Sequence, residues 1–233
     1  MSLHRIKLLV KHLLGRDLLI RRKVHLPLEH YGNRYGDWSV PANYVTKESV
    51  VYSFGIGEDA SWGLALIQAK NCQVQGFDPT PKSLSWVKNH VLDSRFSIHP
   101  WALADLDGTL DLWLPANDDF VSASCRASDS SSSKKITVPC RCLPSIMNEL
   151  GHEFVDVLKM DIEGAEYSVI EQIVNDGLAK RVGVILVEFH HWMSAFKLDD
   201  TRKAIEQLAD VGFLPAWVSE TGHELLFVRP KSI

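Results

Sequence analysis

The chain has 233 residues, of which 45% are hydrophobic and 23% are charged, a composition typical of a globular protein long enough to bury one substantial core. The formal net charge is −4, because acidic residues outnumber lysine and arginine. This balance argues against a nucleic-acid partner. Four unevenly spaced cysteines do not make a disulfide framework, so a reducing, cytoplasmic setting is predicted.

The first segment, residues 1–14, is interrupted by charged residues too often for a signal peptide, and no run in the chain is long and apolar enough to predict an integral membrane segment. It predicts an amphipathic helix packed on the domain through one apolar face, formed by Ile6, Leu9, Val10, Leu13 and Leu14. We expect residues 1–45 to form an N-terminal helix and cap segment, and residues 46–233 to form the main domain.

From about residue 49 to about residue 209, strand-like and helix-like segments alternate, which is typical of βαβ units and a parallel sheet. Buried strands are predicted at residues 49–54, 73–77, 96–101, 155–160 and 182–187. Helices are predicted at residues 60–70, 81–91, 145–150 and 199–209, with another after the acidic turn at residues 161–166.

Two parts of the chain depart from this alternation. Alternating strands at residues 109–114 and 136–142 flank a serine-rich stretch, Ser122 to Ser133, which is predicted to be a loop. Strands at residues 213–218 and 225–229 are separated only by a turn, so the last strand must be antiparallel. The predicted fold is therefore a doubly wound, Rossmann-like α/β domain, with a mostly parallel seven-stranded sheet, an antiparallel last strand and an added ribbon.

Gly55-Ile-Gly57 lies where a strand gives way to a helix, and glycines there allow a sharp turn and close approach to a ligand. Asp78 lies at the tip of the next strand, where a carboxylate can accept the hydroxyls of an adenosine ribose. Both NAD and S-adenosylmethionine fit this arrangement. A short-chain dehydrogenase needs a lysine four residues after a tyrosine, and no tyrosine of this chain has one. This argues against an NAD(P)-dependent oxidoreductase, which is kept as an alternative. A catalytically silent cofactor-binding module is the other alternative.

Four segments together resemble the FkbM family of S-adenosylmethionine-dependent methyltransferases: VYSFGIGED at residues 51–59, GFDP at 76–79, VLKMDIEGAE at 157–166 and LVEFH at 186–190. The resemblance covers about residues 31–230 and implies the class I methyltransferase fold, S-adenosylmethionine as cofactor, and methyl transfer to a hydroxyl of a small metabolite or sugar. Ser53 stands where such methyltransferases usually have an acid, and Asp59 replaces the third glycine. We therefore expect Asp59 or Glu58 to face the ammonium group of the cofactor.

In open α/β sheets ligands bind beyond the carboxyl ends of the strands, so Asp161 and the Glu188 to His191 stretch should face the same crevice as Gly55 and Asp78. The predicted catalytic residues are Asp161, His190 and Glu188, with His190 as the base that removes the hydroxyl proton. The residues expected to bind the cofactor are Ser53, Gly55, Gly57, Asp59, Asp78 and Ala102.

Glu163 and Glu166, near the same crevice, have two interpretations. They either belong to the functional site or cap the helix that follows them, because carboxylates at a helix start offset its positive end. No metal ligands are assigned, although Asp161, Glu163, Glu188 and His190 have the oxygen-rich chemistry that holds a divalent cation. The predicted partner is a small-molecule acceptor with a hydroxyl, and the oligomeric state is not readable from the sequence.

Overall fold

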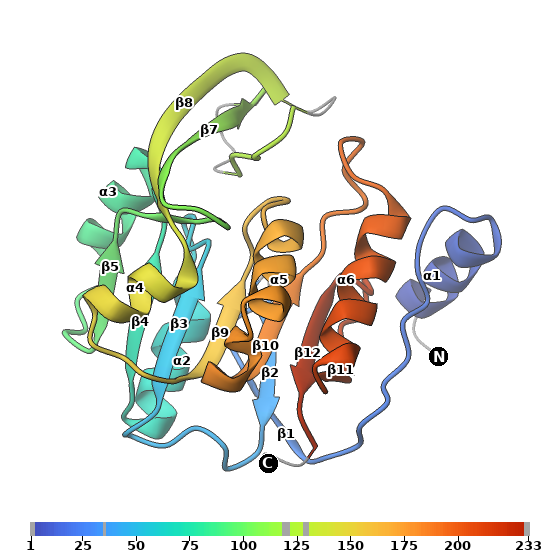
Figure 1. Ribbon diagram of the computed structural model, residues 1–233, viewed down its shortest axis with the longest axis horizontal. Coiled ribbons are helices and arrows are strands. Elements are labelled where there is room, and N and C mark those ends of the chain that lie inside the picture. The colour runs from blue at the N-terminus through green and yellow to red at the C-terminus, as the bar shows by residue number, and fades with distance from the viewer. Residues whose placement is uncertain (1–2, 35, 118–121, 128–130, 231–233) are drawn as a thin grey trace.

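Buried strands alternate with helices to build a central sheet covered on both faces (Figure 1). The computed structural model describes residues 3–34, 36–117, 122–127 and 131–230. The sheet has seven strands in the order β11-β12-β10-β9-β3-β4-β5. Their bounds are β3 Val50–Phe54, β4 Gln73–Phe77, β5 Phe96–His99, β9 Val155–Met160, β10 Val182–Glu188, β11 Leu214–Val218 and β12 Glu224–Val228.

The pairing of these strands confirms the predicted topology. Strands β5, β4, β3, β9 and β10 pair in parallel, whereas β12 is antiparallel to both β10 and β11. Strand β10 is buried along almost its whole length, as expected for a parallel strand with helices on both faces. The strand order changes direction between β3 and β9, and ligands of such sheets bind at that point, beyond the carboxyl ends.

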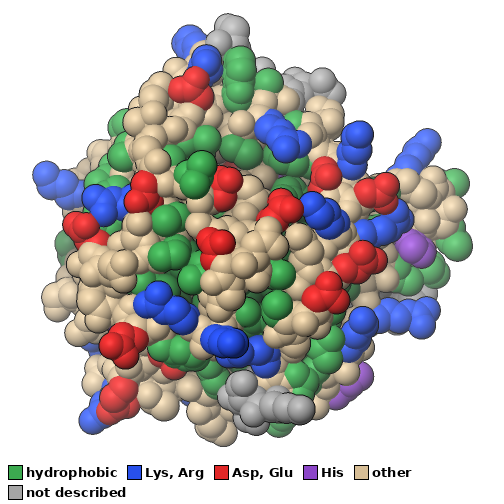
Figure 2. Space-filling model, in the orientation of Figure 1, with side chains coloured by type: hydrophobic (Ala, Val, Ile, Leu, Met, Phe, Trp, Pro, Cys, Tyr) green, Lys and Arg blue, Asp and Glu red, His purple; other side chains and the backbone are tan. Residues whose placement is uncertain are grey.

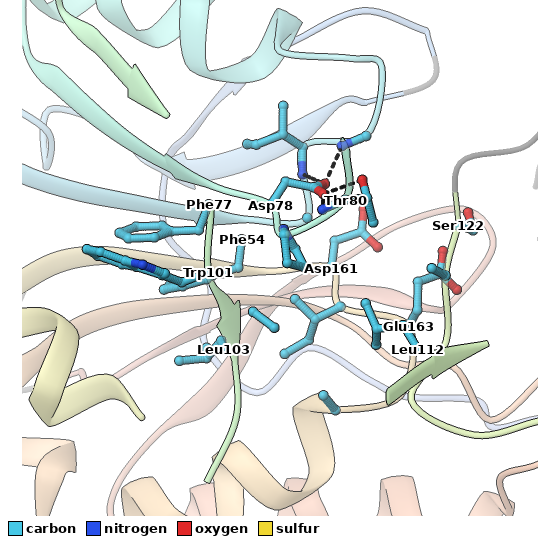
Figure 3. Close-up of a pocket in the computed structure, with 18 of the residues that line it drawn as sticks. Phe54, Phe77, Asp78, Thr80, Trp101, Leu103, Leu112, Ser122, Asp161 and Glu163 are labelled. Atoms are coloured by element: carbon cyan, nitrogen blue, oxygen red, sulfur yellow. Dashed lines mark hydrogen bonds between the residues drawn. The ribbon is translucent and has the colours of Figure 1, made fainter. Parts of the chain in front are cut away.

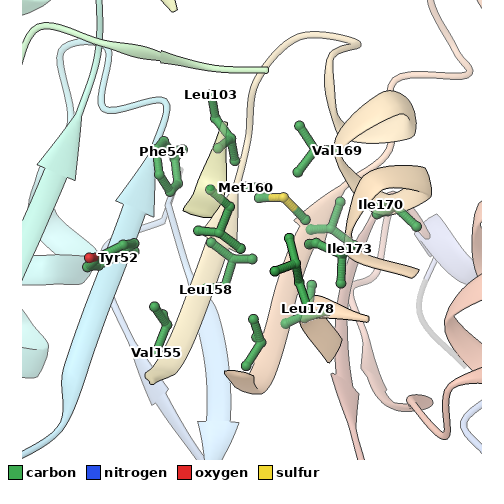
Figure 4. Packing of buried hydrophobic residues seen from close by; sticks show 14 of the residues in the cluster. Tyr52, Phe54, Leu103, Val155, Leu158, Met160, Val169, Ile170, Ile173 and Leu178 are labelled. Atoms are coloured by element: carbon green, nitrogen blue, oxygen red, sulfur yellow. The ribbon is translucent and has the colours of Figure 1, made fainter. Parts of the chain in front are cut away.

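Two apolar cores cover the two faces of the sheet. Helices α4 (Leu143–Glu149), α5 (Glu166–Asn175) and α6 (Leu198–Asp210) lie in front of it in Figure 1, and a 3₁₀ turn at Leu178–Arg181 precedes β10. Figure 4 shows Ile170 and Ile173 of α5 packed toward Leu158 and Met160 of β9. Helices α2 (Ser61–Lys70) and α3 (Pro81–His90) lie behind the sheet and contribute Trp62, Leu66, Ile67 and Val87 to the second core.

A three-stranded sheet arches over the carboxyl ends of the main strands and contains the predicted ribbon. Its strands, in the order β6-β8-β7, are β6 Ala102–Leu103, β7 Gly108–Pro115 and β8 Ser131–Arg141, and β7 and β8 are antiparallel. The strand predicted at residues 96–101 ends earlier, at His99, because the chain then leaves the main sheet and Ala102 pairs with Cys140 of β8.

The serine-rich loop was predicted too long. Residues 131–133 belong to β8, and residues 118–121 and 128–130 lie outside the described residues. The described part between them, residues 122–127, is attached to the ribbon through one buried residue. Ser124 is buried and forms an isolated antiparallel bridge with Trp113 of β7, because its backbone continues the hydrogen-bonding pattern of the ribbon.

The N-terminal helix α1 (Leu3–Leu13) is present, but the predicted packing face is wrong. Val10, Leu13 and Leu14 are 50%, 75% and 62% exposed. The helix instead packs through Leu8, which is 6% exposed and so close to Gly222 that a Cβ there would lie 2.8 Å from its Cδ2 atom. The turn at Gly222 thus contacts one side chain of α1 rather than a broad apolar face of the helix. Among the described helices, none combines the length and the hydropathy of a membrane span.

An antiparallel hairpin, β1 (Leu28–Tyr31) and β2 (Trp38–Pro41), precedes the main sheet and was not predicted. Trp38 and Val40 are buried in the core behind the sheet. Figure 2 shows lysine and arginine interspersed with acidic side chains over the viewed face, rather than gathered into one basic surface.

Candidate functional site

A cavity of about 630 Å³ lies at the carboxyl ends of β3, β4 and β9, between the glycine turn and the ribbon (Figure 3). Its apolar lining includes Trp101, Leu103 and Leu112. Its acidic lining consists of Glu58, Asp59, Asp78, Asp161 and Glu163. This is where the strand order predicts a ligand, and the volume is within the range of about 300–1,000 Å³ typical of small-molecule sites.

The glycine turn is shaped by its contact with the acidic segment after β9. Gly55 has φ +76°, and a Cβ atom added to it would lie 1.7 Å from the carbonyl oxygen of Asp161. Its amide donates to the Phe77 carbonyl at 3.0 Å, while the Asp161 amide donates to the Phe54 carbonyl at 3.2 Å. Only glycine therefore fits where the turn crosses the end of β9.

Asp78 lines the cavity as predicted, and it also holds the glycine turn (Figure 3). Its Oδ2 atom accepts hydrogen bonds from the amides of Ile56 at 3.1 Å and Gly57 at 2.9 Å. Its Oδ1 atom accepts from the Thr80 amide at 2.9 Å and the Thr80 hydroxyl at 2.6 Å. A carboxylate has about four acceptor positions, so these four bonds fill them and fix the turn beside the cavity.

The remaining residues expected to bind the cofactor divide between two cavities. Gly57 and Ala102 line the main one. Ser53 is buried and instead lines a neighbouring polar cavity of about 110 Å³. Asp59 borders both; its Oδ1 accepts from the Ser61 amide at 2.8 Å and its Oδ2 from Asn33 Nδ2 at 2.9 Å. Asp59 thus holds the amide of the first residue of α2 and borders both cavities.

The predicted catalytic residues come together at the ends of β9 and β10. The Nε2 atom of His190 lies 3.8 Å from Asp161 Oδ1 and 3.9 Å from Glu188 Oε1. Glu163 is closer, with its Oε2 atom 3.5 Å from the same nitrogen. Asp161 borders both cavities, whereas His190 is 1% exposed and lies behind the carboxylates. The described residues thus place one imidazole in an arc of three acids.

Glu166 anchors this imidazole, a role that the sequence reasoning missed. Its carboxylate is fully buried, and its Oε1 atom lies 3.0 Å from His190 Nδ1 and accepts from the His190 amide at 3.2 Å. Its other oxygen accepts from the Gly164 amide at 2.9 Å, which agrees with the predicted position at a helix start. Donation from Nδ1 to Glu166 leaves Nε2 facing Asp161, Glu163 and Glu188.

Burial and neighbouring charges shift the pKa values of three side chains in this cluster. Burial alone lowers the pKa of His190, but the charge of Glu166 and its hydrogen bond, with the charges of Glu163 and Glu188, raise it well above the usual 6.5. Burial, with repulsion from Asp161, raises the pKa of Glu188 to about 9. Burial also raises the pKa of Glu163. Groups with such shifts, gathered beside a cavity, are typical of functional sites.

Lys159 is a second residue that the sequence reasoning missed. It is 5% exposed, its Nζ atom lies 3.7 Å from Asp161 Oδ2 and 4.8 Å from the centre of the Trp38 ring, and it lines the smaller cavity. A lysine inside the predicted buried strand at residues 155–160 was the available signal. Its positive charge offsets part of the acidic charge around Asp161.

Comparison with known proteins decides the class of the domain. The family model for the methyltransferase FkbM domain matches residues 39–219, which is most of the chain. This chain belongs to the FkbM methyltransferase family. The membership confirms the predicted family, the methyltransferase class of the domain, and S-adenosylmethionine as the cofactor of that class.

Individual relatives of this FkbM domain are more distant. The Homo sapiens protein named probable methyltransferase-like protein 24 is 30% identical over 147 residues, which is 63% of this chain and 34% of that protein. The Rattus norvegicus protein of the same name is 30% identical over 148 residues. The alignment thus spans about a third of the curated relatives. The crystal structure of methyltransferase FkbM from Methylobacillus flagellatus shares 13% identity and superposes with a TM-score of 0.51, covering 79% of this chain and 44% of that one, which confirms the fold class.

Proposed function

We propose that this chain binds S-adenosylmethionine in the main cavity and transfers its methyl group to a hydroxyl of a small metabolite or sugar. The cofactor supplies a methyl group activated by a positively charged sulfonium. The observation that carries the proposal is the lining of the cavity, which combines the acids Asp59, Asp161 and Glu163 with apolar side chains. Such a lining suits a ligand that has cationic groups and an adenine ring.

The roles proposed for the acids follow from their distances. Asp161 borders the cavity and orients the acceptor hydroxyl, whose proton has to leave as the new bond to carbon forms. The proton passes through the carboxylates of Asp161 and Glu163 to Nε2 of His190, which lies 3.8 Å and 3.5 Å from them. Glu166 stabilises the resulting imidazolium through Nδ1, as a carboxylate does for a histidine base in other enzymes. Glu188 completes the acidic surroundings of His190.

Melting curves of the purified full chain test the choice of cofactor. A ligand that binds only the folded state raises the melting temperature, so S-adenosylhomocysteine should raise it and NAD should not. Stabilisation by NAD alone would support an oxidoreductase instead. Stabilisation by S-adenosylhomocysteine without turnover of any acceptor would support a catalytically silent binding module.

The nature of the acceptor needs a direct assay. The chain should release S-adenosylhomocysteine from S-adenosylmethionine with members of a panel of sugars and hydroxylated metabolites, and not with their O-methylated counterparts. Turnover only with amines would reject oxygen as the methylated atom. The expectation of a cytoplasmic setting rests on the four cysteines, all of which are unpaired.

A further inference from the structure

Three segments distant in sequence bring two histidines and one carboxylate together beside α1. Asp17 follows α1, His191 follows β10, and His223 lies in the turn between β11 and β12. None of the three lines either cavity, so the cluster is separate from the proposed methyl-transfer site. Asp17 and His191 are 2% and 6% exposed. No role in methyl transfer accounts for this cluster.

The distances in this cluster approach those of a metal site. His191 Nε2 lies 2.9 Å from Asp17 Oδ1, and His223 Nε2 lies 3.5 Å from Asp17 Oδ2. One atom from each of the three side chains lies within 4.8 Å of the others. Zinc–ligand bonds of about 2.0–2.2 Å in a tetrahedron separate neighbouring ligand atoms by about 3.4 Å. Small movements would therefore bring all three atoms to one ion.

The surrounding hydrogen bonds orient the side chains for this role. His191 Nδ1 lies 3.0 Å from the Thr201 hydroxyl, which leaves Nε2 turned toward Asp17. The Leu18 amide donates to Asp17 Oδ1 at 2.8 Å. The Nε2 atom of His223 is buried and makes no hydrogen bond with any described residue. A buried ring nitrogen that lies 3.5 Å from a carboxylate without forming a hydrogen bond to it is the observation that an ordinary hydrogen-bonded cluster leaves unexplained.

We propose that Asp17, His191 and His223 bind a divalent transition-metal ion of the zinc type, with water completing its coordination. Two imidazole ligands favour such an ion over magnesium or calcium, which prefer oxygen. Lys11, whose Nζ atom lies 3.2 Å from Asp17 Oδ2, occupies part of the position, but its side chain is 55% exposed and has room to move away. The ion would join α1 to the segment that contains His190.

Zinc binding by the full chain tests this proposal independently of activity. The protein is treated with EDTA, dialysed and titrated with zinc chloride in a calorimeter, and one zinc ion per chain should bind. His223→Gln, which removes one ligand at a partly exposed turn, should weaken this binding at least about 100-fold, since even the loss of an outer-sphere partner costs about 10- to 100-fold. Zinc should also raise the melting temperature of the wild-type chain and not that of His223→Gln.

Two further variants locate the ion. His25→Gln, at an exposed histidine outside the cluster, should bind zinc like the wild type. His190→Gln should as well, because Asp161, Glu163 and His190 form a separate group. Loss of zinc binding in His190→Gln but not in His223→Gln would overturn the assignment and place the ion in the acidic cluster.

Cobalt provides a measurement that needs no variant. Co²⁺ added to the EDTA-treated wild-type chain should give the visible absorption of a cobalt ion with a low coordination number. Zinc should then displace the cobalt. Absence of both cobalt absorption and zinc binding would overturn the proposal and leave Asp17, His191 and His223 as a hydrogen-bonded cluster. These outcomes do not depend on methyl transfer, so the two proposals can fail separately.

Discussion

At the scale of single residues, the surroundings of His190 determine how it can act. A base must be unprotonated before it accepts a proton, and the acids around His190 raise its pKa well above 6.5 despite burial. The fraction of unprotonated His190 in the chain therefore increases as the pH rises through that elevated pKa. The turnover number should increase with pH over the same range, above the usual titration of histidine.

Replacing this histidine tests that role. His190→Gln should lower turnover by about 10²- to 10⁴-fold, the usual contribution of a general base, and should remove the rise of the turnover number with pH. Its affinity for S-adenosylhomocysteine should stay near that of the wild type, because His190 does not line the cavity. His25→Gln is the matched control. A wild-type rate that does not change with pH would contradict the assignment of His190 as the base.

Asp78 holds the glycine turn and is proposed to bind the cofactor, and a single substitution should test both functions together. Asp78→Asn removes the charge that accepts amide hydrogen bonds from Ile56 and Gly57, and it weakens any bond to the cofactor ribose. Each hydrogen bond to a charged group contributes about 1.5–3 kcal/mol, so affinity for S-adenosylhomocysteine should fall about 10- to 100-fold in calorimetry. Asp176→Asn, at an exposed position, should change neither affinity nor stability. Equal affinity in Asp78→Asn and wild type would reject the cofactor role.

The sequence predicted those site residues that end parallel strands, because the carboxyl ends of such strands meet at one edge of the sheet. Asp161, Glu188 and His190 are close together for this reason. The pairing of Glu166 with His190 joins a helix start to a loop after another strand, and this depends on tertiary packing that no local pattern specifies. The proposed roles of these residues remain predictions.

At the scale of elements, the crossing of the glycine turn over β9 has a direct test. Gly55 and Gly151 have similar positive φ values, +76° and +71°, but a Cβ on Gly55 would meet the Asp161 carbonyl whereas a Cβ on Gly151 would meet nothing within 4 Å. Gly151→Ala should cost only the strain of the left-handed conformation, about 1–2 kcal/mol. Gly55→Ala should cost about 1–3 kcal/mol more, because two strand ends have to separate.

Chemical denaturation of both variants, with S-adenosylhomocysteine binding as a second measurement, checks this prediction. Gly55→Ala should also lose cofactor affinity, since the displaced turn lines the cavity. Equal free energies of unfolding for the two variants would show that the close approach of Gly55 to Asp161 does not constrain the turn.

The sequence predicted the elements of the main sheet well because four of its parallel strands, β3, β4, β9 and β10, are short and mostly apolar runs that are followed by a helix with its own signals. It was less informative where pairing is nonlocal. The β1–β2 hairpin has strands of only four residues, and the helix α1 packs through Leu8 rather than through its longer apolar face. The extent of β8 into the serine-rich stretch depends on its partner β7, not on its own composition.

At the scale of the whole molecule, the ribbon and the central sheet enclose the main cavity from two sides. Leu110 and Leu112 of β7 line it opposite the glycine turn, and the Ser124 hydroxyl donates to the Glu163 carbonyl at 2.8 Å. The antiparallel pair β11–β12 lies at the other edge of the sheet. Ligand binding in the main cavity should therefore restrain one half of the molecule more than the other.

Hydrogen exchange measured on the full chain tests this expectation. Saturating S-adenosylhomocysteine should slow amide exchange in the glycine turn at residues 55–59 and in β7, because openings that expose these amides would break ligand contacts. Exchange in β11 and β12 should change little, and the same amount of NAD should protect neither region. Protection confined to the glycine turn would show that the ribbon does not take part in binding. Protection of β11 and β12 without β7 would contradict the placement of the cofactor in the main cavity.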